Sequence, residues 1–380
     1  MKRFRITRIM LIIVAVLAVA YALSPFYLRY ALLYQQPDLD DYTIFNNRVV
    51  MAGDYQPWSL VPGFDKKVIP QTYIKQFDKL KTVAFLVIKN EKIVFEKYWN
   101  GYSAEKKFNS FSMATSIVSL LIGKAIDEGF IKNVDQPIGD FLPDYKTGAK
   151  AKITIRHLLE MSSGLSWDEN YNSLTSMTTK GYYGDDVTKL VLDQSVKREP
   201  GVFFDYKSGN TELLALILAR ATGSDISSYA SEKLWKPMGA KSDALWSTDQ
   251  ANGVEKAFCC FNSTPRDFAR FGLLALNRGR WFDQQLVSEA YMTQALKPVN
   301  HLIDYKNKNV DYFGWDWWLM NYRGYQVYYM MGLNGQYVIA VPELKLVIVR
   351  LGKKCSTELT RGIPSDFFTW FDAGMEIAGS

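Results

Sequence analysis

The sequence is poor in cysteine and histidine. It contains three cysteines and two histidines, His157 and His301. No C-x-x-C, H-E-x-x-H or G-x-S-x-G motif occurs, so a zinc site, thioredoxin-like chemistry and an α/β-hydrolase nucleophile elbow are not indicated. A Ser-His-Asp triad is hard to assemble from so few histidines. We therefore expect no metal and no cofactor, and we expect His157 to have a structural role.

The cysteines are too few for a disulfide framework. Cys259 and Cys260 are adjacent, and a bridge between them could hardly form without strain. We expect both, together with Cys355, to be buried as small hydrophobic side chains.

Charge and composition exclude a further class of protein. The 380 residues include 45 basic and 39 acidic side chains, which leaves a formal net charge of +6. No basic run is interleaved with aromatic residues, so nucleic-acid binding is not expected. A hydrophobic content of 48% is enough for a sizeable core in one large domain or two intimately packed domains.

A charge-free run near the N-terminus predicts export. Residues 9–28 carry no charged side chain and follow a basic cluster. About 20 such residues can span a bilayer as a helix, and the basic cluster would then stay cytoplasmic. A cleaved signal peptide, with a small-residue site at residues 20–22, is the alternative. We favour an uncleaved anchor within residues 1–34, with the main domain periplasmic or extracellular; cleavage would make the protein secreted.

Residues 111–129 are expected to form one long buried helix. Apolar residues recur there near helical spacing, and Gly129 is a suitable stop signal. Ser112 lies at the front of this helix, where backbone N–H groups are unpaired and the helix dipole is positive. An oxygen that becomes negative during a reaction would be stabilised there. Ser112 is therefore the candidate nucleophile, and the alternative is a serine that only caps the helix.

Other elements follow from local patterns in the sequence. A hairpin is expected in residues 81–99 with its turn near residues 89–92, and an extended, wrapping segment is expected in residues 37–79. The remaining predictions are helices at 153–165, 210–222, 264–279 and 367–377, and strands at 325–331, 337–341 and 344–351.

Three short segments occur in an informative order. They are Ser112–Thr115 at the helix start, Tyr206–Ser208 after a Pro-Gly turn, and Met330–Gly332, which Leu333-Asn334-Gly335-Gln336 follows. V-D-Q-P, I-T-I-R-H-L-L and S-G-L lie between the first two. This set resembles the class C β-lactamase-like and penicillin-binding-protein-related serine hydrolases, in particular their 6-aminohexanoate-dimer hydrolase and esterase branch.

The resemblance implies an α/β (α+β) fold. A mainly antiparallel sheet would be flanked by helices and joined to an all-helical subdomain, as in β-lactamases and transpeptidases. Residues 35–380 would form the hydrolase domain, with its α/β part at about 35–111 and 245–380 and its helical part at about 112–244. The active site would lie between the two parts.

The resemblance also implies roles for individual residues. Ser112 would attack the substrate and form an acyl-enzyme, and the backbone N–H groups of Ser112 and Leu333 would form the oxyanion hole. Tyr206 would move protons as acid and base, provided that nearby cations lower its pKa. Ser208 and Gly332 would contact the substrate.

The tryptophan-rich run Y-F-G-W-D-W-W-L adds two candidates. Trp315 and Trp317 are expected to wall a substrate cleft, with core packing as the alternative for both.

The sequence departs from the family pattern at one position that carries chemistry. The family motif S-x-x-K would place a lysine at position 115, on the same helix face as Ser112, but the residue is Thr115. A hydroxyl is not a base near neutral pH. Lys124 lies about 18 Å farther along the helix, and nothing in the sequence directs Lys207 inward. The cation that β-lactam enzymes place beside Gly332 is also absent, which argues against β-lactams as the main substrate.

Two functions remain open. The first is an exported serine hydrolase that acts on a small-molecule ester or amide and is impaired by the missing lysine. The second is a pseudoenzyme that binds a ligand in the retained cleft. In both, the N-terminal helix is the only expected contact with a membrane.

Overall fold

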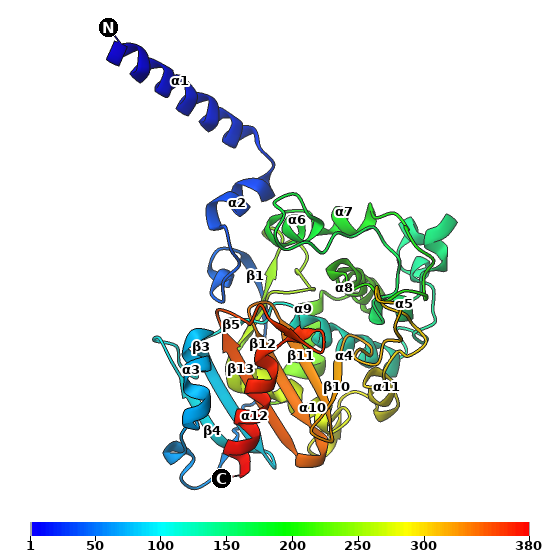
Figure 1. The fold of residues 1–380 in the computed structure, drawn as a ribbon. Coiled ribbons are helices and arrows are strands. Elements are labelled where there is room, and N and C mark those ends of the chain that lie inside the picture. The colour runs from blue at the N-terminus through cyan, green and yellow to red at the C-terminus, as the bar shows by residue number, and fades with distance from the viewer. Residues whose placement is uncertain (1, 380) are drawn as a thin grey trace.

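The computed structural model describes residues 2–379. A part built around a large sheet lies beside a part made mainly of helices, and one N-terminal helix projects away from both (Figure 1). The helices are α1 (Lys2–Leu23), α2 (Phe26–Tyr34), α3 (Gln71–Lys79), α4 (Met113–Asp127), α5 (Ile155–Leu159), α6 (Met177–Tyr183), α7 (Val187–Leu192), α8 (Ser208–Thr222), α9 (Ile226–Ala230), α10 (Pro265–Leu276), α11 (Glu289–Ala295) and α12 (Asp366–Gly379).

The larger sheet is antiparallel except for one short pair. Its strand order is β10-β11-β12-β13-β3-β4-β2, and only β2 and β4 run parallel among the strands that the structure describes. The strands are β2 (Ser59–Leu60), β3 (Thr82–Lys89), β4 (Lys92–Tyr98), β10 (Trp318–Tyr322), β11 (Tyr325–Gly332), β12 (Gln336–Val341) and β13 (Leu346–Gly352).

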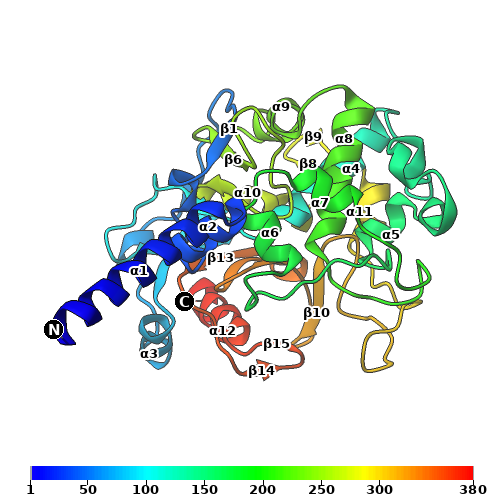
Figure 2. The ribbon, with the colours of Figure 1, turned by 90° about the horizontal axis from the view of Figure 1, so that it is seen from above.

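Helices cover both faces of this sheet (Figure 2). Side chains on β13 alternate, so that Ile348 packs in the core on the α12 side, whereas Val347 and Val349 pack in the core on the α10 side. Two glycines let the helices approach closely. A Cβ on Gly374 of α12 would lie 2.3 Å from Ile348 Cδ1, and a Cβ on Gly272 of α10 would lie 2.6 Å from Val347 Cγ1. Burial on both faces explains why these strands are almost continuously apolar in sequence.

A smaller sheet joins segments that are far apart in the chain. Its order is β1-β6-β7-β5, with β1 (Asn46–Val50), β5 (Phe108–Asn109), β6 (Ala244–Thr248) and β7 (Phe261–Ser263). The sequence did not predict this sheet, because its strands have only two to five residues. Two further pairs are β8 (Arg280–Trp281) with β9 (Gln284–Gln285), and β14 (Leu359–Thr360) with β15 (Ile363–Pro364).

Helix α4 is the centre of the helical part. It is buried over most of its length and packs on α8, which also contacts α5, α7 and α9. Helix α8 ends at Gly223, whose φ of +70° is a left-handed conformation that glycine adopts without steric cost.

Most of the predicted elements are present, and the predicted α/β fold class is confirmed. The expected helix at 111–129 is α4, and the expected hairpin at 81–99 is β3 and β4 with a turn at Asn90 and Glu91. The predicted helix at 153–165 is shorter than expected. Helix α5 ends at Leu159, and Met161 then turns the chain with a φ of +54°. The extended segment at 37–79 contains the helix α3, which was not predicted.

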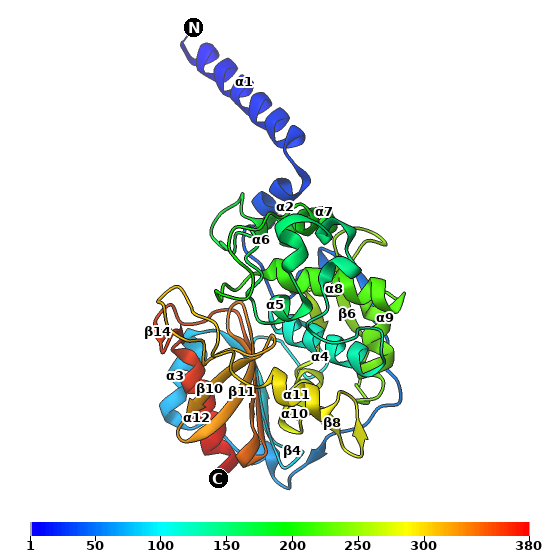
Figure 3. The ribbon, with the colours of Figure 1, turned by 90° about the vertical axis from the view of Figure 1, so that its right-hand side faces the viewer.

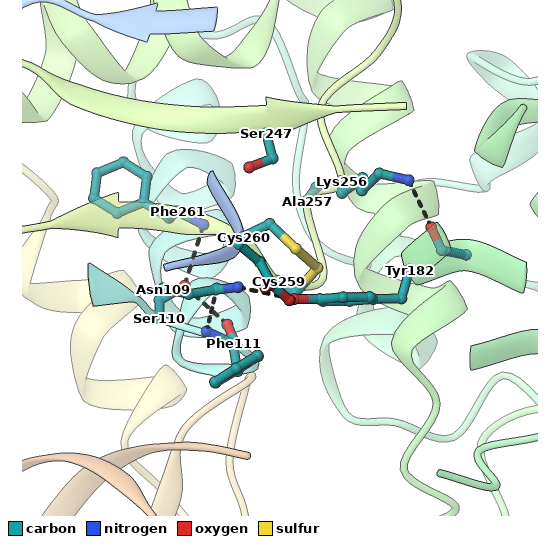
Figure 4. Close-up of a disulfide and its surroundings, with 12 residues drawn as sticks. Asn109, Ser110, Phe111, Tyr182, Ser247, Lys256, Ala257, Cys259, Cys260 and Phe261 are labelled. Carbon is teal, nitrogen blue, oxygen red and sulfur yellow. Dashed lines mark hydrogen bonds between the residues drawn. A yellow bond between two sulfur atoms is a disulfide. The ribbon is translucent and has the colours of Figure 1, made fainter. Parts of the chain in front are cut away.

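The expectation for the adjacent cysteines was wrong. Cys259 and Cys260 form a disulfide with each other (Figure 4). Cys260 has a φ of +69°, which is unusual for a residue other than glycine and was not visible in the sequence. The prediction of burial is correct for both residues, which are 3% and 0% exposed. Cys355 is a free, partly buried thiol.

The apolar window of the N-terminal helix is not buried. The apolar window Ile6–Leu23 of α1 has a mean hydropathy of 2.5 and is 0% buried, so the helix is long and apolar enough to cross a bilayer. A signal sequence has the same properties. Helix α1 leaves the molecule at the end where α2, α6 and α7 lie (Figure 3).

Candidate active site

Ser112 lies at the turn that leads from β5 into α4. Phe111, directly before it, has a φ of +45°, and its N–H donates to Asn109 Oδ1 at 2.9 Å. Ser112 is the residue before the first turn of α4, but its side chain makes no capping hydrogen bond. The side chain is partly exposed. The serine is therefore available for chemistry and is not used as a helix cap.

Two cavities meet at Ser112. One, which we call the α6 pocket, has a volume of about 180 Å³ and is lined by residues of α6, by the end of α2 and by Ser112. The other, which we call the β11 pocket, has a volume of about 340 Å³ and is lined by Ser112, Tyr206 and the end of β11. A substrate bound across Ser112 would therefore have a separate cavity for each side of its reacting bond.

Gly332 brings the end of β11 against the segment that carries the nucleophile. A Cβ at Gly332 would lie 2.3 Å from the carbonyl oxygen of Ser110 and 3.2 Å from Phe111 Cβ, so any side chain would push the strand away. Leu333 follows and lines both pockets. Among residues 2–379, no hydrogen-bond acceptor occurs for the N–H of Ser112 or of Leu333. Both groups are free to bind an oxyanion.

Tyr206 faces Ser112 across the β11 pocket. Burial, together with Glu169 and Asp316, raises the pKa of the Tyr206 hydroxyl far above its ordinary value, and the nearby hydroxyls of Ser112 and Thr115 only partly oppose this shift. The Tyr206 hydroxyl makes no hydrogen bond to any described residue. Among the described residues, no cation lines the pocket to lower its pKa. Tyr206 therefore keeps its proton near neutral pH and can donate it.

Glu169 and Tyr171 complete the site, and sequence analysis missed both. Glu169 Oε1 accepts a hydrogen bond from the Tyr171 hydroxyl at 2.6 Å, and the carboxylate also accepts from the N–H and the hydroxyl of Ser208 at 2.7 and 2.6 Å. Burial raises the pKa of Glu169, and the Ser208 hydrogen bonds partly oppose this shift. Although the Tyr171 side chain as a whole is half exposed, burial of its hydroxyl raises the pKa of Tyr171, and the nearby Ser112 partly opposes this shift. The Tyr171 hydroxyl thus lies near Ser112 and is hydrogen-bonded to a carboxylate.

No positively charged side chain takes the place of the family lysine. Thr115 is buried, and its hydroxyl donates to the carbonyl oxygen of Ser112 at 3.0 Å. Lys207 points away from the site and bonds to Asp205 and to the carbonyl oxygen of Trp167, each at 2.9 Å. No lysine, arginine or histidine lines either cavity within the described part of the chain. Glu169 is the charged residue that lines the β11 pocket.

Asp316 is a second buried acid that electrostatically affects Tyr206. It is 0% exposed, neither carboxylate oxygen has a partner among the described residues, and burial raises its pKa well above the ordinary value. Its backbone has a φ of +59°.

The tryptophans are arranged differently from the prediction. Trp315 and Trp317 are 6% and 1% exposed and line neither cavity, and the Trp315 indole donates to Glu160 at 3.0 Å. Trp318 lines the β11 pocket instead, and its ring stacks on Tyr206 with 5.8 Å between the ring centroids. The turn at Asp316 interrupts the alternation of side chains that an unbroken strand would have.

The structure brings most of the predicted residues together. Ser112, Tyr206, Gly332 and Leu333 line the β11 pocket, and Ser208 lines the α6 pocket. No group of three or more His, Cys, Asp or Glu side chains suited to a metal ion occurs in the described residues.

Comparison with known proteins identifies the family of the chain. The family model described as "Beta-lactamase" matches residues 71–358. The chain belongs to the beta-lactamase family. Among curated relatives of this family member, the 6-aminohexanoate-dimer hydrolase of Paenarthrobacter ureafaciens is 26% identical over 232 residues, which are 58% of this chain and 59% of the relative. Protein flp of Staphylococcus aureus (strain COL) is 27% identical over 166 residues, which are 41% of this chain and 33% of the relative. The matches thus span between a third and three fifths of these relatives.

Solved structures share the fold of this beta-lactamase family member. A Bacillus anthracis protein with the provisional name 6-aminohexanoate-dimer hydrolase matches with a TM-score of 0.77 at 20% identity, over 93% of this chain and 94% of its own. A family VIII carboxylesterase matches with a TM-score of 0.62 at 14% identity, over 85% of this chain and 99% of its own. The chain therefore has the fold of these structures, whose names include a 6-aminohexanoate-dimer hydrolase and a carboxylesterase.

Proposed function

We propose that the protein is an exported, membrane-anchored serine hydrolase that cleaves an ester or amide through an acyl-enzyme on Ser112. The observation that carries the proposal is the position of Ser112 at the meeting point of two cavities, beside the unpaired N–H groups of Ser112 and Leu333. The apolar helix α1 and the cluster of basic residues at its start support anchoring with the main domain outside.

Acylation would begin with attack of Ser112 Oγ on the substrate carbonyl carbon. The serine proton passes to the Tyr171 hydroxyl oxygen while the Tyr171 proton passes to Glu169, which replaces the missing lysine as the base. The substrate carbonyl oxygen becomes negative and is held by the two backbone N–H groups. Each such donor typically contributes about 3–4 kcal/mol to the transition state.

Collapse of the tetrahedral intermediate would break the bond to the leaving group. The leaving oxygen or nitrogen takes a proton from Tyr171 or Tyr206, and the proton held by Glu169 restores the tyrosine. Tyr206 suits the acid role because its raised pKa keeps it protonated. Water then attacks the acyl-enzyme by the same route in reverse and releases the acid.

A pseudoenzyme that only binds a ligand is the second candidate. One observation favours it: Thr115 stands at the lysine position, and no cation lines either cavity in the described residues. Loss of one member of a catalytic group can cost a factor on the order of 10⁴–10⁶ in turnover.

Labelling with a fluorophosphonate separates the two functions. The full-length chain, its Ser112→Ala variant and its Thr115→Lys variant would be incubated with the probe, and the modified residue identified by mass spectrometry. We expect labelling of Ser112 in the parent, none in Ser112→Ala, and faster labelling in Thr115→Lys. Labelling only in Thr115→Lys would support the pseudoenzyme, and labelling in neither would exclude the hydrolase.

A further inference from the structure

We propose that the substrate is an uncharged amphiphilic ester or amide that reaches Ser112 from the membrane surface through the α6 pocket. This inference rests on the function proposed above and names the class of substrate for that site. Three observations support it: the position of the α6 pocket near the end of α1, the residues that line this pocket, and the absence of positively charged side chains from both pockets in the described residues.

The α6 pocket lies close to the end of the apolar helix. Helix α1 ends at Leu23 and α2 begins at Phe26, so three Cα–Cα steps of 3.8 Å separate them, and the gap is at most about 11 Å. If α1 spans a bilayer, α2 lies at the bilayer surface. Figures 1 and 3 both show α2 and α6 at the end of the molecule from which α1 projects.

Helix α2 packs against the main domain. It packs on α6, the Lys180 ammonium lies 5.8 Å from the centre of the Tyr27 ring, and Ala31 is 2% exposed. Ala31, Gln35 and Gln36 form one wall of the α6 pocket, and Ser112 lies in the same pocket. The pocket wall that lies nearest the membrane therefore belongs to the same cavity as the nucleophile, Ser112.

Exposed apolar side chains surround this end of the molecule. Leu32 and Leu33 of α2 are 47% and 62% exposed, and Leu174 and Tyr171, which line the pocket, are 46% and 49% exposed. Single exposed leucines need no explanation. Here they occur on the helix directly after α1 and at the pocket itself, where contact with lipid would bury them.

The charges of the site select the substrate. No charged side chain lines the α6 pocket in the described residues, and its polar groups are hydroxyls and amides such as Gln35, Asn172 and Thr179. The β11 pocket adds Glu169, and its other walls include Trp318 and Met331. An anionic group would find no cation near Ser112 and would face a carboxylate. The site therefore suits a neutral ester or amide with one apolar part.

Two fluorophosphonates would test the entry route. The full-length chain in phosphatidylcholine vesicles would react with a probe that carries a sixteen-carbon chain and with a short, water-soluble probe. The parent, a Leu32→Glu/Leu33→Glu variant and a Val68→Glu control would be compared, because Val68 is 77% exposed on a different segment. The ratio of the two labelling rates is the readout, since it cancels any general loss of reactivity.

We expect the parent and Val68→Glu to share a high ratio of long-chain to short-chain labelling. In Leu32→Glu/Leu33→Glu the ratio should fall at least about tenfold, since two leucines lose apolar contact, while short-chain labelling stays within about twofold. Equal ratios in all three proteins would overturn entry at this end, because partitioning of the probe into the vesicle would then explain any preference. Faster labelling by the short probe would also overturn it.

A second measurement does not depend on catalysis. The Ser112→Ala variant in the same vesicles would be irradiated with a neutral dodecyl glyceryl ether that carries a diazirine beside the glyceryl group. We expect adducts within residues 31–37 and 171–183, and adducts confined to α1 would overturn the proposal. If no fluorophosphonate labels the parent but these adducts form, the hydrolase fails while binding of an amphiphile stands.

Discussion

The backbone around Ser112 gives it three features. The residue before it has a positive φ, Ser112 itself lies at the start of α4, and two nearby backbone N–H groups have no acceptor among the described residues. Phe111 has a positive φ, and Gly332 lets the neighbouring strand come within contact of Ser110. In the proposed reaction, the fold itself would therefore supply stabilisation of the oxyanion. Removal of the serine proton would depend instead on side chains, and we propose Glu169 and Tyr171 as the groups that accept it.

The carboxylate of Glu169 should control the pH dependence of the reaction. Its pKa is raised above the ordinary 4.5 by burial, and only the ionised form can accept a proton. The rate of Ser112 labelling should therefore fall as the pH drops through this raised pKa. Glu169→Gln should remove that dependence and slow labelling by about 100-fold, in line with loss of a general base.

Tyr171→Phe should slow labelling to a similar extent, since it removes the hydroxyl that passes the serine proton to Glu169 in the proposed mechanism. Far-UV circular dichroism would show whether the variants remain folded. A pH profile that is unchanged in Glu169→Gln would contradict the role of this carboxylate.

Gly332 is the residue at which a single methyl group should abolish the site. In Gly332→Ala the new Cβ would lie 2.3 Å from the Ser110 carbonyl oxygen, so β11 must shift and take the Leu333 N–H with it. Loss of one oxyanion donor predicts at least about a 100-fold decrease in Ser112 labelling. Gly379→Ala is the matched control, because a Cβ there has no atom within 4 Å. Normal labelling of Gly332→Ala would exclude Leu333 from the oxyanion hole.

At the scale of elements, α8 carries a buried acid that links the helical part to the segment before β7. Glu212 Oε2 accepts from the Ala257 N–H at 2.8 Å, whereas Oε1 has no partner in the described chain. Burial raises the pKa of Glu212 to about 8, and the nearby Lys256 ammonium opposes the shift. The neutral acid is therefore the form that the folded state favours.

This shift predicts a pH-dependent difference in stability. A raised folded-state pKa gives stability that is present below about pH 4.5 and is lost as the pH rises towards 8. Glu212→Gln stays neutral, so its unfolding free energy relative to the parent should increase between pH 5 and 8, by at most about 1.4 kcal/mol per pH unit. Thermal unfolding in detergent at several pH values measures the difference. Glu199 forms an exposed ion pair with Lys152, so the unfolding free energy of Glu199→Gln should vary with pH in the same way as that of the parent. The same pH dependence in Glu212→Gln and the parent would contradict the raised pKa of Glu212.

At the scale of the whole molecule, a short connection and the packing of α2 on α6 place the main domain beside α1. The mass of the mature protein distinguishes a retained anchor from a cleaved signal peptide. The protein extracted from membranes should have the full mass of 43.5 kDa and should resist extraction by alkaline carbonate. A mass smaller by residues 1–22, with the protein in the soluble fraction, would show that α1 is removed.

Local patterns predicted most of the regular elements and the order of the site segments. The helical spacing in α4, the turn at Asn90 and Glu91 and the apolar runs of β11 to β13 each depend on a few neighbouring residues. The pairing of Cys259 with Cys260 was missed for a similar reason. It occurs with a left-handed backbone at Cys260, a conformation that sequence rules assign to glycine first.

The sequence alone determined that a serine begins a buried helix, that Thr115 stands at the position of the family lysine, and that a charge-free apolar run precedes the domain, because each of these is a property of adjacent residues. Only the tertiary structure decided that Glu169 and Tyr171 join Ser112, and that Trp318 rather than Trp315 or Trp317 faces the cavity. Such contacts depend on how distant segments pack and on one backbone turn, and no spacing within the chain records them.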